Sequence, residues 1–401
     1  MGSAIAGRPL DGPDALGAAI DEFLATWAQP PTLLAIGEPT HGIAAFPLLR
    51  NEILRHLVGR GYQSIALETD IFAATTVDDF VAGAPGEVGS VLGAGFSHGF
   101  GNVPGNRELV EWLRTHNSGR SPADRVRFHG FDAPLETSAA PSPRGSLTAV
   151  RDFLPAALRP ASADDLDVLS GDDAEWSNPA AMFDPAVSIG DSDRARALRV
   201  VADDLFSALR RAAPGLSPAD PAGFDAAVAH ARTALGLLRY HAAMARPAPD
   251  RIGVLLSVRA EMMADNLHAI LAQERDRGPC LVFAHNVHLL RAPSEMSFGA
   301  DPTTWWSAGA LLGRTLGERY VVIATDANPD SDPTTLQGVL AAATDHRTLF
   351  RSDELRAALP PSIGPGEPIV PGHIPLRPAD LAGTDAVVFI ADTDGRRHQY
   401  W

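Results

Sequence analysis

The sequence predicts an α/β fold in which a mostly parallel sheet is flanked by helices and carries an inserted helical subdomain. In the first and last thirds of the chain, short apolar runs alternate with amphipathic helical patterns, which is typical of strand–helix–strand units. A long middle stretch contains helical patterns only. Polar side chains come directly after several of the apolar runs, where the carboxyl ends of parallel strands form a ligand-binding edge.

The opening elements of the sheet follow one another in the first third of the chain. Asp11 is positioned to cap a helix that begins at Pro13. Two apolar runs, 32–36 and 64–67, predict strands on either side of an amphipathic helix over 44–60. We expect these two strands to pair in parallel through a right-handed crossover. Further elements are expected in this order: a short helix over 75–81, a glycine-rich loop over 82–104, a helix over 107–116 and a strand over 126–131.

The rest of the chain divides into a helical stretch and a second α/β stretch. Residues 135–278 contain no run typical of a strand, so we expect a helical insertion or lid between the two parts of the α/β core, 1–134 and 279–401. The helical patterns lie over 147–154, 193–211, 222–244 and 252–277. In the last part we expect strands over 280–284, 320–325 and 385–390, helices over 308–316 and 352–359, and a Pro-rich linker or surface loop over 360–378.

Composition limits the partners and the chemistry. The 401 residues carry a formal net charge of −16, and an acidic surface argues against nucleic acid and anionic membranes as partners. A small-molecule substrate, which is the partner we expect, stays compatible with that charge because one cationic pocket can lie in an acidic shell. All 33 basic residues are arginine, which excludes Schiff-base and Walker-type lysine chemistry.

Cys280 is the only cysteine and lies inside an apolar run, which favours a buried core position. Neither an intrachain disulfide nor a cysteine-based metal cluster is therefore available. The N-terminal residues lack the pattern of a signal peptide, and no apolar run is long enough to span a bilayer. We therefore expect a cytoplasmic protein that does not bind membranes.

The polar residues that follow the predicted strands are the candidates for one active site. Taken singly, a carboxylate after a strand is often a helix cap, and a histidine is often structural. Four separate strands deliver these residues to one edge of the sheet, which favours a shared catalytic role. The set consists of Glu38, His41, Glu68, Asp132, His285 and His288. Arg50, in the helix after the first strand, is a natural partner for buried carboxylates.

Three chemistries fit this set. In general-base hydrolysis, His41 takes a proton from water, a carboxylate orients its ring, and His285 donates a hydrogen bond to a substrate oxygen. In the second, a zinc or manganese site, the ligands by residue type are Glu38, His41, Glu68, His285 and His288, although their spacing matches no known metal motif. In the third, residues 95–99 match the G-x-S-x-G motif of serine nucleophiles. That motif needs a strand before it and a helix after it, and neither is predicted.

These motifs together resemble the erythromycin esterase family. The opening family motif is similar to Ile-Gly-Glu-Pro-Thr-His-Gly over 36–42, followed by an arginine nine residues after the histidine, here Arg50. Later family motifs are similar to Ala66-Leu67-Glu68, Gly130-Phe131-Asp132 and Ala284-His285-Asn286-Val287-His288. Arg259 and the segments 263–267, 309–316 and 385–390 extend the resemblance over nearly the whole chain.

The resemblance implies an α/β core with a helical insertion and a deep cleft. It also implies hydrolysis of a macrolide lactone by an activated water, without a metal or other cofactor. In that scheme His41 is the general base, Glu38 and Glu68 position it and the water, and Arg50 anchors the carboxylates. His285 polarises the carbonyl or protonates the leaving alkoxide. The residues expected to contact the substrate are His288, Asp132, His98 and Asn102.

The chain departs from the family in one place. The family usually carries a tryptophan-containing motif shortly before its Leu-x-x-Trp-Leu helix, where this sequence has residues 98–104. That region is expected to line the substrate cleft. An alternative function is therefore a biosynthetic tailoring step on another natural product, such as cyclisation or elimination by the same base. A third interpretation is a non-catalytic binding protein that keeps the cleft as a ligand site.

Overall fold

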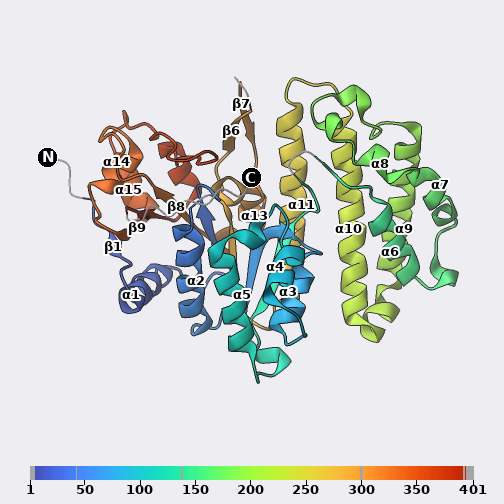
Figure 1. The fold of residues 1–401 in the computed structure, drawn as a ribbon, viewed down its shortest axis with the longest axis horizontal. Helices are drawn as coiled ribbons and strands as arrows, with labels where there is room; N and C mark the ends of the chain where they lie inside the picture. Colours follow the sequence, from blue (N-terminus) through green and yellow to red (C-terminus); the bar gives the residue numbers. More distant parts are fainter. Residues whose placement is uncertain (1–4, 42, 137–138, 299–300, 392, 394–401) are drawn as a thin grey trace. The chain divides into compact units, whose positions relative to one another are not determined.

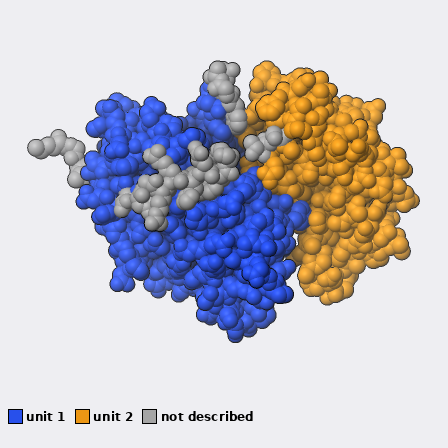
Figure 2. Space-filling model, viewed as in Figure 1, with its two compact units in different colours: residues 1–131, 267–401 blue, residues 132–266 orange. Residues whose placement is uncertain are grey.

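The structure is a computed structural model that describes residues 5–41, 43–136, 139–298, 301–391 and 393 (Figure 1). Gly42, the last residue of the opening motif, lies outside the described residues. The chain divides into two compact units, residues 1–131 with 267–401 and residues 132–266, which are coloured separately in Figure 2. The helical insertion expected over 135–278 extends beyond the second unit, because helix α11 (Arg251–Gln273) continues without a break past residue 266.

The first unit contains an eight-stranded sheet. The strands lie in the spatial order β1 (Arg8–Pro9), β9 (Arg347–Arg351), β10 (Ala386–Ile390), β8 (Tyr320–Ala327), β2 (Leu33–Glu38), β5 (Cys280–His285), β3 (Ser64–Asp70) and β4 (Arg127–Asp132). The five strands from β10 to β3 are parallel, whereas β9 is antiparallel to both of its neighbours. The predicted α/β fold with a mostly parallel sheet is thus confirmed. Strands β6 (Ser294–Phe298) and β7 (Asp301–Trp305) form a separate antiparallel pair.

Helices cover both faces of this sheet, because alternate strand residues point to opposite sides. One face packs on helices α1 to α5 through a core that includes Ile36, Phe283 and Ile323. The other face packs on α14 and α15 through a core that includes Val387 and Phe389. The helices of this unit are α1 (Pro13–Leu24), α2 (Ala45–Val58), α3 (Ala74–Val81), α4 (Val88–Gly95), α5 (Pro104–Asn117), α12 (Asn286–Leu289), α13 (Ala308–Leu316), α14 (Leu336–Ala341) and α15 (Ser352–Ala358).

The second unit is helical. Its helices are α6 (Arg144–Phe153), α7 (Leu166–Ser170), α8 (Asp173–Trp176), α9 (Asp193–Ala219), α10 (Pro221–Met244) and the first part of α11. The long helices α9 and α10 lie side by side (Figure 1), and a core of its own, including Leu198, Leu205 and Trp176, holds this unit together. None of the described helices is both long enough and apolar enough to cross a membrane.

Short 3₁₀ turns connect many of these elements in both units. They are Phe100–Asn102, Pro122–Asp124, Ala156–Leu158, Ala161–Asp165, Pro179–Met182, Pro185–Val187, Gly317–Arg319 and Pro378–Gly383.

The sequence prediction is wrong about which strands are neighbours. The first two predicted strands, now β2 and β3, do not pair with each other, because β5 lies between them and is parallel to both. All three strands are buried along nearly their whole length, so each has the apolar composition of a central strand. Composition does not distinguish their order, and β5 arrives from more than two hundred residues further along the chain.

Several short elements are also missed or misplaced. Helix α4 lies inside the segment predicted as a glycine-rich loop, and β1, β6, β7, β9 and α14 are too short or too polar to give a periodic signal. The predicted cap at Asp11 is wrong. The cap residue of α1 is Gly12, whose φ of 83° is in the left-handed region that favours glycine, and no side chain caps the helix.

The insertion of β5 requires a close approach at Gly37. The side chain of Asn286, directly after β5, lies against this glycine, and a Cβ atom there would be 2.1 Å from Asn286 Oδ1 and 3.0 Å from Asn286 Cα. The Asn286 amide donates to the carbonyl of Thr325 in β8, and the Thr325 hydroxyl donates to the carbonyl of Gly37. Gly37 therefore lets three neighbouring strand ends close on one another.

We expect Gly37→Ala to destabilise the fold by about 1–3 kcal/mol, because the added methyl group must displace the buried side-chain amide of Asn286. Urea denaturation measures this loss. The matched control is Gly93→Ala in α4, where a Cβ meets nothing within 4 Å and helix propensity improves. A Gly37 variant as stable as the Gly93 variant would contradict the close approach.

Candidate active site

Three parallel strands bring the central polar residues to one sheet edge. Glu38 is the last residue of β2, and its register partner is His285, the last residue of β5. Glu68 lies within β3, two residues before its end, rather than after the strand as the sequence suggests. His41 lies in the turn between β2 and α2, and His288 lies in the single-turn helix α12.

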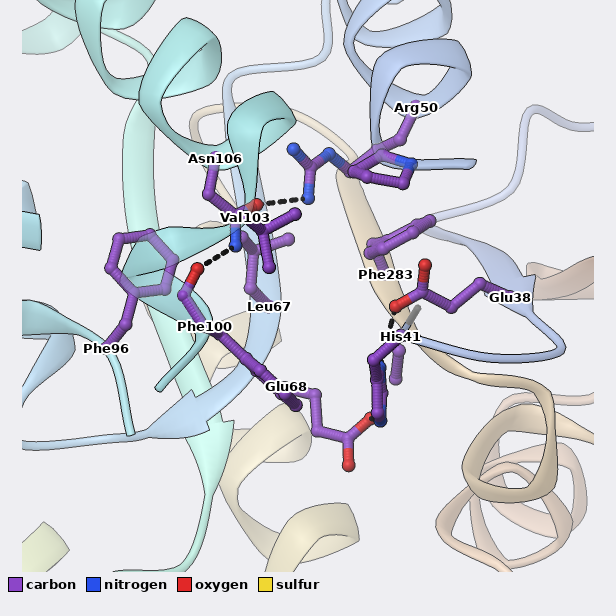
Figure 3. A pocket seen from close by; sticks show the side chains of 12 residues that line it. Glu38, His41, Arg50, Leu67, Glu68, Phe96, Phe100, Val103, Asn106 and Phe283 are labelled. Atoms are coloured by element: carbon purple, nitrogen blue, oxygen red, sulfur yellow. Dashed lines mark hydrogen bonds and ion pairs between the residues drawn. The ribbon is translucent and has the colours of Figure 1, made fainter. Parts of the chain in front are cut away.

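His41 and Glu38 are in direct contact (Figure 3). The Nδ1 atom of His41 lies 2.8 Å from Glu38 Oε1. An ionised carboxylate only accepts hydrogen bonds, so we assign the hydrogen to Nδ1 and the lone pair to Nε2. Nε2 lies 4.0 Å from Glu68 Oε2. The imidazole thus has one nitrogen held by a carboxylate and a second nitrogen in the form that accepts a proton.

Glu68 joins the ends of β3 and β5. Its Oε2 atom accepts a hydrogen bond of 2.8 Å from the backbone N–H of His285, and its Oε1 atom lies 3.1 Å from His288 Nε2. The carboxylate is nearly fully buried, so these contacts replace most of the water that it loses on folding. Glu68 therefore fixes both late histidines relative to the turn that carries His41.

His285 is held as a neutral ring. Its Nδ1 atom accepts a 3.3 Å hydrogen bond from the backbone N–H of Val287, which leaves the hydrogen on Nε2. Burial lowers its pKa from 6.5 to about 3, and the neighbouring His41 and His288 also lower it, whereas Glu68 and the Pro39 carbonyl act in the opposite direction. The buried Nε2 atom has no hydrogen-bond partner among the described residues.

Burial raises the pKa of the Glu38 carboxyl above its ordinary value. The hydrogen bond and charge of His41 and the charge of Arg50 oppose this shift, and the nearby Glu68 adds to it. Glu38 and His285 are therefore displaced in opposite directions: the acid holds its proton more readily, and the base loses its proton more readily. Groups with such shifted pKa values are characteristic of functional sites.

Arg50, in helix α2, is almost completely buried. Its guanidinium donates to Asn51 Oδ1, to Asn106 Oδ1 at 2.8 Å and to the backbone carbonyl of Gly105. It also lies 4.7 Å from the ring centre of Phe283 (Figure 3). Arg50 acts on Glu38 through its charge. Its close contacts to Asn51 and Asn106 were not anticipated from the sequence.

A pocket with about 340 Å³ of empty space, part of it open to solvent, adjoins these groups. It is large enough to hold a water molecule. The residues that line it are Glu38, His41, Pro47, Arg50, Leu67, Glu68, Phe96, Phe100, Val103, Asn106, Phe283 and Ala284. The ring of Phe100 packs against His41 at 4.5 Å between centres, so an apolar wall stands beside the imidazole. Phe100 was not singled out in the sequence, because one aromatic residue in a glycine-rich segment carries no periodic signal.

None of the four residues expected to contact substrate is among those that line the pocket, although His288 contacts Glu68. His98, with a left-handed φ of 58°, places its ring 5.4 Å from Phe100 but is not among the residues that line the pocket, and Asn102 is exposed. Asp132 belongs to the second unit, where its carboxylate accepts a 3.0 Å hydrogen bond from Arg259 Nε. Contact of these residues with substrate stays a prediction.

The serine alternative lacks its structural context. Residues 95–99 follow helix α4 rather than a strand and precede a short 3₁₀ turn. The hydroxyl of Ser97 accepts a 3.0 Å hydrogen bond from the backbone N–H of Asp70 and lies 3.2 Å from the Thr69 hydroxyl, while the Ser97 N–H donates to Thr69. Ser97 therefore ties this segment to β3. Within the part of the chain that the structure describes, no three His, Cys, Asp or Glu residues are arranged to hold a metal ion.

Comparisons with known proteins agree with this architecture. A family model described as erythromycin esterase matches residues 58–360. Similar solved structures include a Bacillus cereus protein, with a TM-score of 0.70, 16% identity, and coverage of 96% of this chain and 94% of that chain. They also include a succinoglycan biosynthesis protein, with a TM-score of 0.64, 15% identity, and coverage of 96% and 94%. A mutant of the erythromycin esterase EreC in its open conformation has a TM-score of 0.68, 19% identity, and coverage of 92% of each chain.

At these identities the likeness to solved structures shows the fold. No curated protein sequence matches the chain significantly.

We expect acidification to destabilise the protein partly through His285. The unfolded ring binds a proton below its ordinary pKa of 6.5, whereas the folded ring stays neutral until about 3. Its contribution to stability is therefore complete above pH 6.5 and is lost as the pH falls from 6.5 towards 3. Urea midpoints measured from about pH 7.5 down to about pH 5 should fall less steeply for His285→Asn than for the unmodified chain.

Other groups affect the same measurement. The buried His241, whose pKa is lowered to about 4, acts in the same direction, as do His116 and His230, whose pKa values burial also lowers. Glu38, whose pKa is raised, acts in the opposite direction. All of them are present in the chain with and without the His285 substitution, so the difference in slope isolates His285. Equal slopes would contradict a buried neutral ring at this position.

Proposed function

The chain belongs to the erythromycin esterase family, and on this premise we propose that it is an esterase-like hydrolase that cleaves a lactone or ester by general-base activation of water. One observation carries the proposal. His41 is held by a carboxylate at Nδ1, and it lines a pocket that can admit water. This is the carboxylate–imidazole pair that serves as a proton acceptor in many hydrolases.

The proposed reaction has two steps. In the first, His41 Nε2 takes a proton from water while the water oxygen bonds to the carbonyl carbon, and the carbonyl π electrons move to its oxygen. In the second, the oxyanion re-forms the carbonyl, the bond to the alkoxy oxygen breaks, and the imidazolium returns its proton to that oxygen. Glu38 stabilises the positive ring between the two steps.

His285 suits the role of oxyanion donor. Its Nε2–H is buried and lacks a partner among the described residues, so hydrogen bonding to a developing negative charge replaces an unsatisfied group. A neutral donor does not lose its hydrogen at neutral pH, and a pKa of about 3 keeps the ring neutral there. Glu68 positions this donor through the His285 backbone, with His288 on its other oxygen.

We propose a bulky natural product, either a macrolide-like lactone or another ester, as the substrate. The pocket beside His41 has room for a water molecule but not for a whole macrocycle, so it serves the reacting water and the acyl carbon. The cytoplasmic location and the small-molecule partner expected from the sequence belong to the same proposal.

Replacing the proposed base tests this function. We expect His41→Gln to lower kcat by about 10²–10⁴-fold, the usual contribution of a general base, with the fold intact. The assay follows erythromycin and a panel of aryl esters by mass spectrometry in ¹⁸O-labelled water. Hydrolysis adds one labelled water to the product. The control is His116→Gln, which changes a partly exposed histidine that stacks on Trp112.

Unchanged turnover in a folded His41 variant would overturn the role of the base. A product without added water would instead identify the tailoring alternative.

The fall of kcat/KM at low pH gives a second test. Glu38 must be ionised to hold His41 Nδ1–H, and its pKa is raised by burial. Protonation of either His41 or Glu38 removes the base, so we expect kcat/KM to fall in two steps as the pH is lowered, with the lower step at a higher pH than an exposed glutamate would give. The pH–rate profile measures both steps, and Glu38→Gln should remove the lower step while lowering the plateau. A lower step at the ordinary glutamate pKa would contradict the role of Glu38.

A further inference from the structure

A second buried cluster of polar residues lies at the end of β8, outside the pocket. Its centre is Asp326, which is 0% exposed and accepts four hydrogen bonds. The donors are Ala327 N at 2.8 Å, His373 Nε2 at 3.0 Å, Gln337 Nε2 at 2.6 Å and Leu376 N at 2.8 Å. Every lone-pair direction of this carboxylate is thus occupied by a donor from the chain.

His373 in this cluster has a defined tautomer. Its Nδ1 atom accepts a 3.0 Å hydrogen bond from the backbone N–H of Ile369, so the hydrogen lies on Nε2 and is donated to Asp326. Gln337 accepts from the backbone N–H of Gly366 and donates to the carbonyl of Leu376. These contacts fasten residues 366–376, which we call the strap, to the end of β8. The strap is an irregular surface segment, as the sequence predicts for 360–378, but its residues His373 and Leu376 are buried.

The strap reaches the turn that carries His41. The backbone N–H of Ile374, next to His373, donates a 2.9 Å hydrogen bond to the carbonyl of Pro39. Pro39 directly follows Glu38 in the chain. The same carbonyl is close enough to His285 to affect its ring. One hydrogen bond from the strap therefore holds the Pro39 carbonyl, which lies in the chain between Glu38 and His41.

The chemistry of the cluster points to positioning rather than to stability alone. Burying a carboxylate and an imidazole is costly, and an apolar set of the same volume often gives equal or greater stability. A fully satisfied polar network instead defines one geometry, because each donor must meet its own acceptor. The strap already has apolar anchors, since Leu376 is part of the core and Ile369 and Val370 pack against it.

We propose that Asp326, His373 and Gln337 are positioning residues that hold the strap so that Ile374 N–H sets the Pro39 peptide and, through it, the contact between Glu38 and His41. The geometric part of this inference does not need the proposed function. Its consequence for turnover rests on that function.

The test uses the full chain with ¹⁵N-labelled histidine. The Nδ1–H proton of His41, held by Glu38, gives a downfield resonance that is identified by its loss in His41→Gln. In His373→Leu and Asp326→Asn we expect this proton to exchange with water about ten times faster or more, and kcat on an accepted ester to fall about 10- to 100-fold with KM nearly unchanged. His373→Gln, which keeps a donor towards Asp326, should restore most of both properties.

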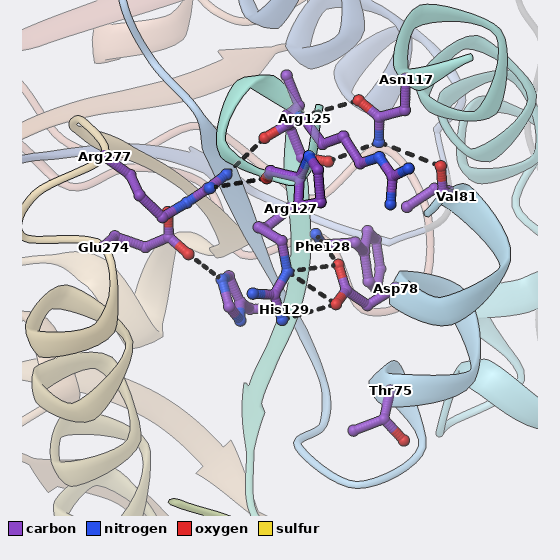
Figure 4. Close-up of polar contacts among 12 residues, drawn as sticks. Thr75, Asp78, Val81, Asn117, Arg125, Arg127, Phe128, His129, Glu274 and Arg277 are labelled. Atoms are coloured by element: carbon purple, nitrogen blue, oxygen red, sulfur yellow. Dashed lines mark hydrogen bonds and ion pairs between the residues drawn. The ribbon is translucent and has the colours of Figure 1, made fainter. Parts of the chain in front are cut away.

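The matched control is His129→Leu. His129 forms another buried histidine–carboxylate pair, with its Nε2 atom 2.9 Å from Glu274 Oε1, and Arg277 donates to the same carboxylate (Figure 4). It should lose stability like His373→Leu and leave the His41 resonance and kcat unchanged. Ile374→Pro covers the case in which His373→Leu does not fold, because it deletes the N–H that meets Pro39 and keeps the Asp326–His373 pair.

The outcomes separate the two proposals. A His41 resonance and exchange rate unchanged in folded His373→Leu or Ile374→Pro would overturn the positioning inference. An equal response in His129→Leu would also overturn it, because the effect would then follow from lost stability. A resonance that responds in a chain that hydrolyses no ester would support positioning and overturn the hydrolase proposal.

Discussion

The carboxylate of Glu68 is the contact on which the arrangement of the site depends. It accepts a hydrogen bond from the backbone N–H of His285, the last residue of β5, and contacts the His288 ring, although β3 and α12 are far apart in the sequence. Because the group is buried, losing one of these partners is costly. Glu68 thereby joins the strand end that carries it to the histidines of the neighbouring strand. The register between β2 and β5 does the same for Glu38 and His285.

Burial gives these similar groups different properties. Desolvation disfavours charge on any side chain, so it makes Glu38 a weaker acid and His285 a weaker base. His41 is more accessible than either, and its Nδ1 atom lies 2.8 Å from a carboxylate. One imidazole is thus suited to accept a proton and the other to donate a hydrogen bond without changing charge. The division follows from position, since the free side chains of the two histidines are identical.

The polar residues around this centre act through backbone contacts. Asn106 and Gly105 hold Arg50, Thr325 and Asn286 close the strand ends on Gly37, and the strap reaches Pro39. These contacts come from different parts of the chain and end on the last residues of β2, on the turn after it or on helix α2. The turn is therefore held from several sides, which is the preorganisation that general-base chemistry requires.

The sequence by itself determined the fold class and the residues that lie at the centre of the site. Alternating apolar runs and amphipathic patterns identified β2, α2, β3, β5 and β8, because a central strand that is buried on both faces consists of consecutive apolar residues. The polar residues after these runs identified Glu38, His41, Glu68, His285 and His288, since parallel strands deliver their carboxyl ends to one edge. The short edge strands and α4 gave no such signal, because a few residues do not define a period.

Only the tertiary structure decided which groups meet. Strand order depends on long-range packing, so the sequence could not show that β5 separates β2 from β3 and brings His285 against Glu38. The same reason explains the strap, because Asp326 and His373 are 47 residues apart and neither belongs to a recognisable local motif. The sequence shows which residues can act as acids and bases, whereas their pKa values and hydrogen-bond partners depend on the folded environment.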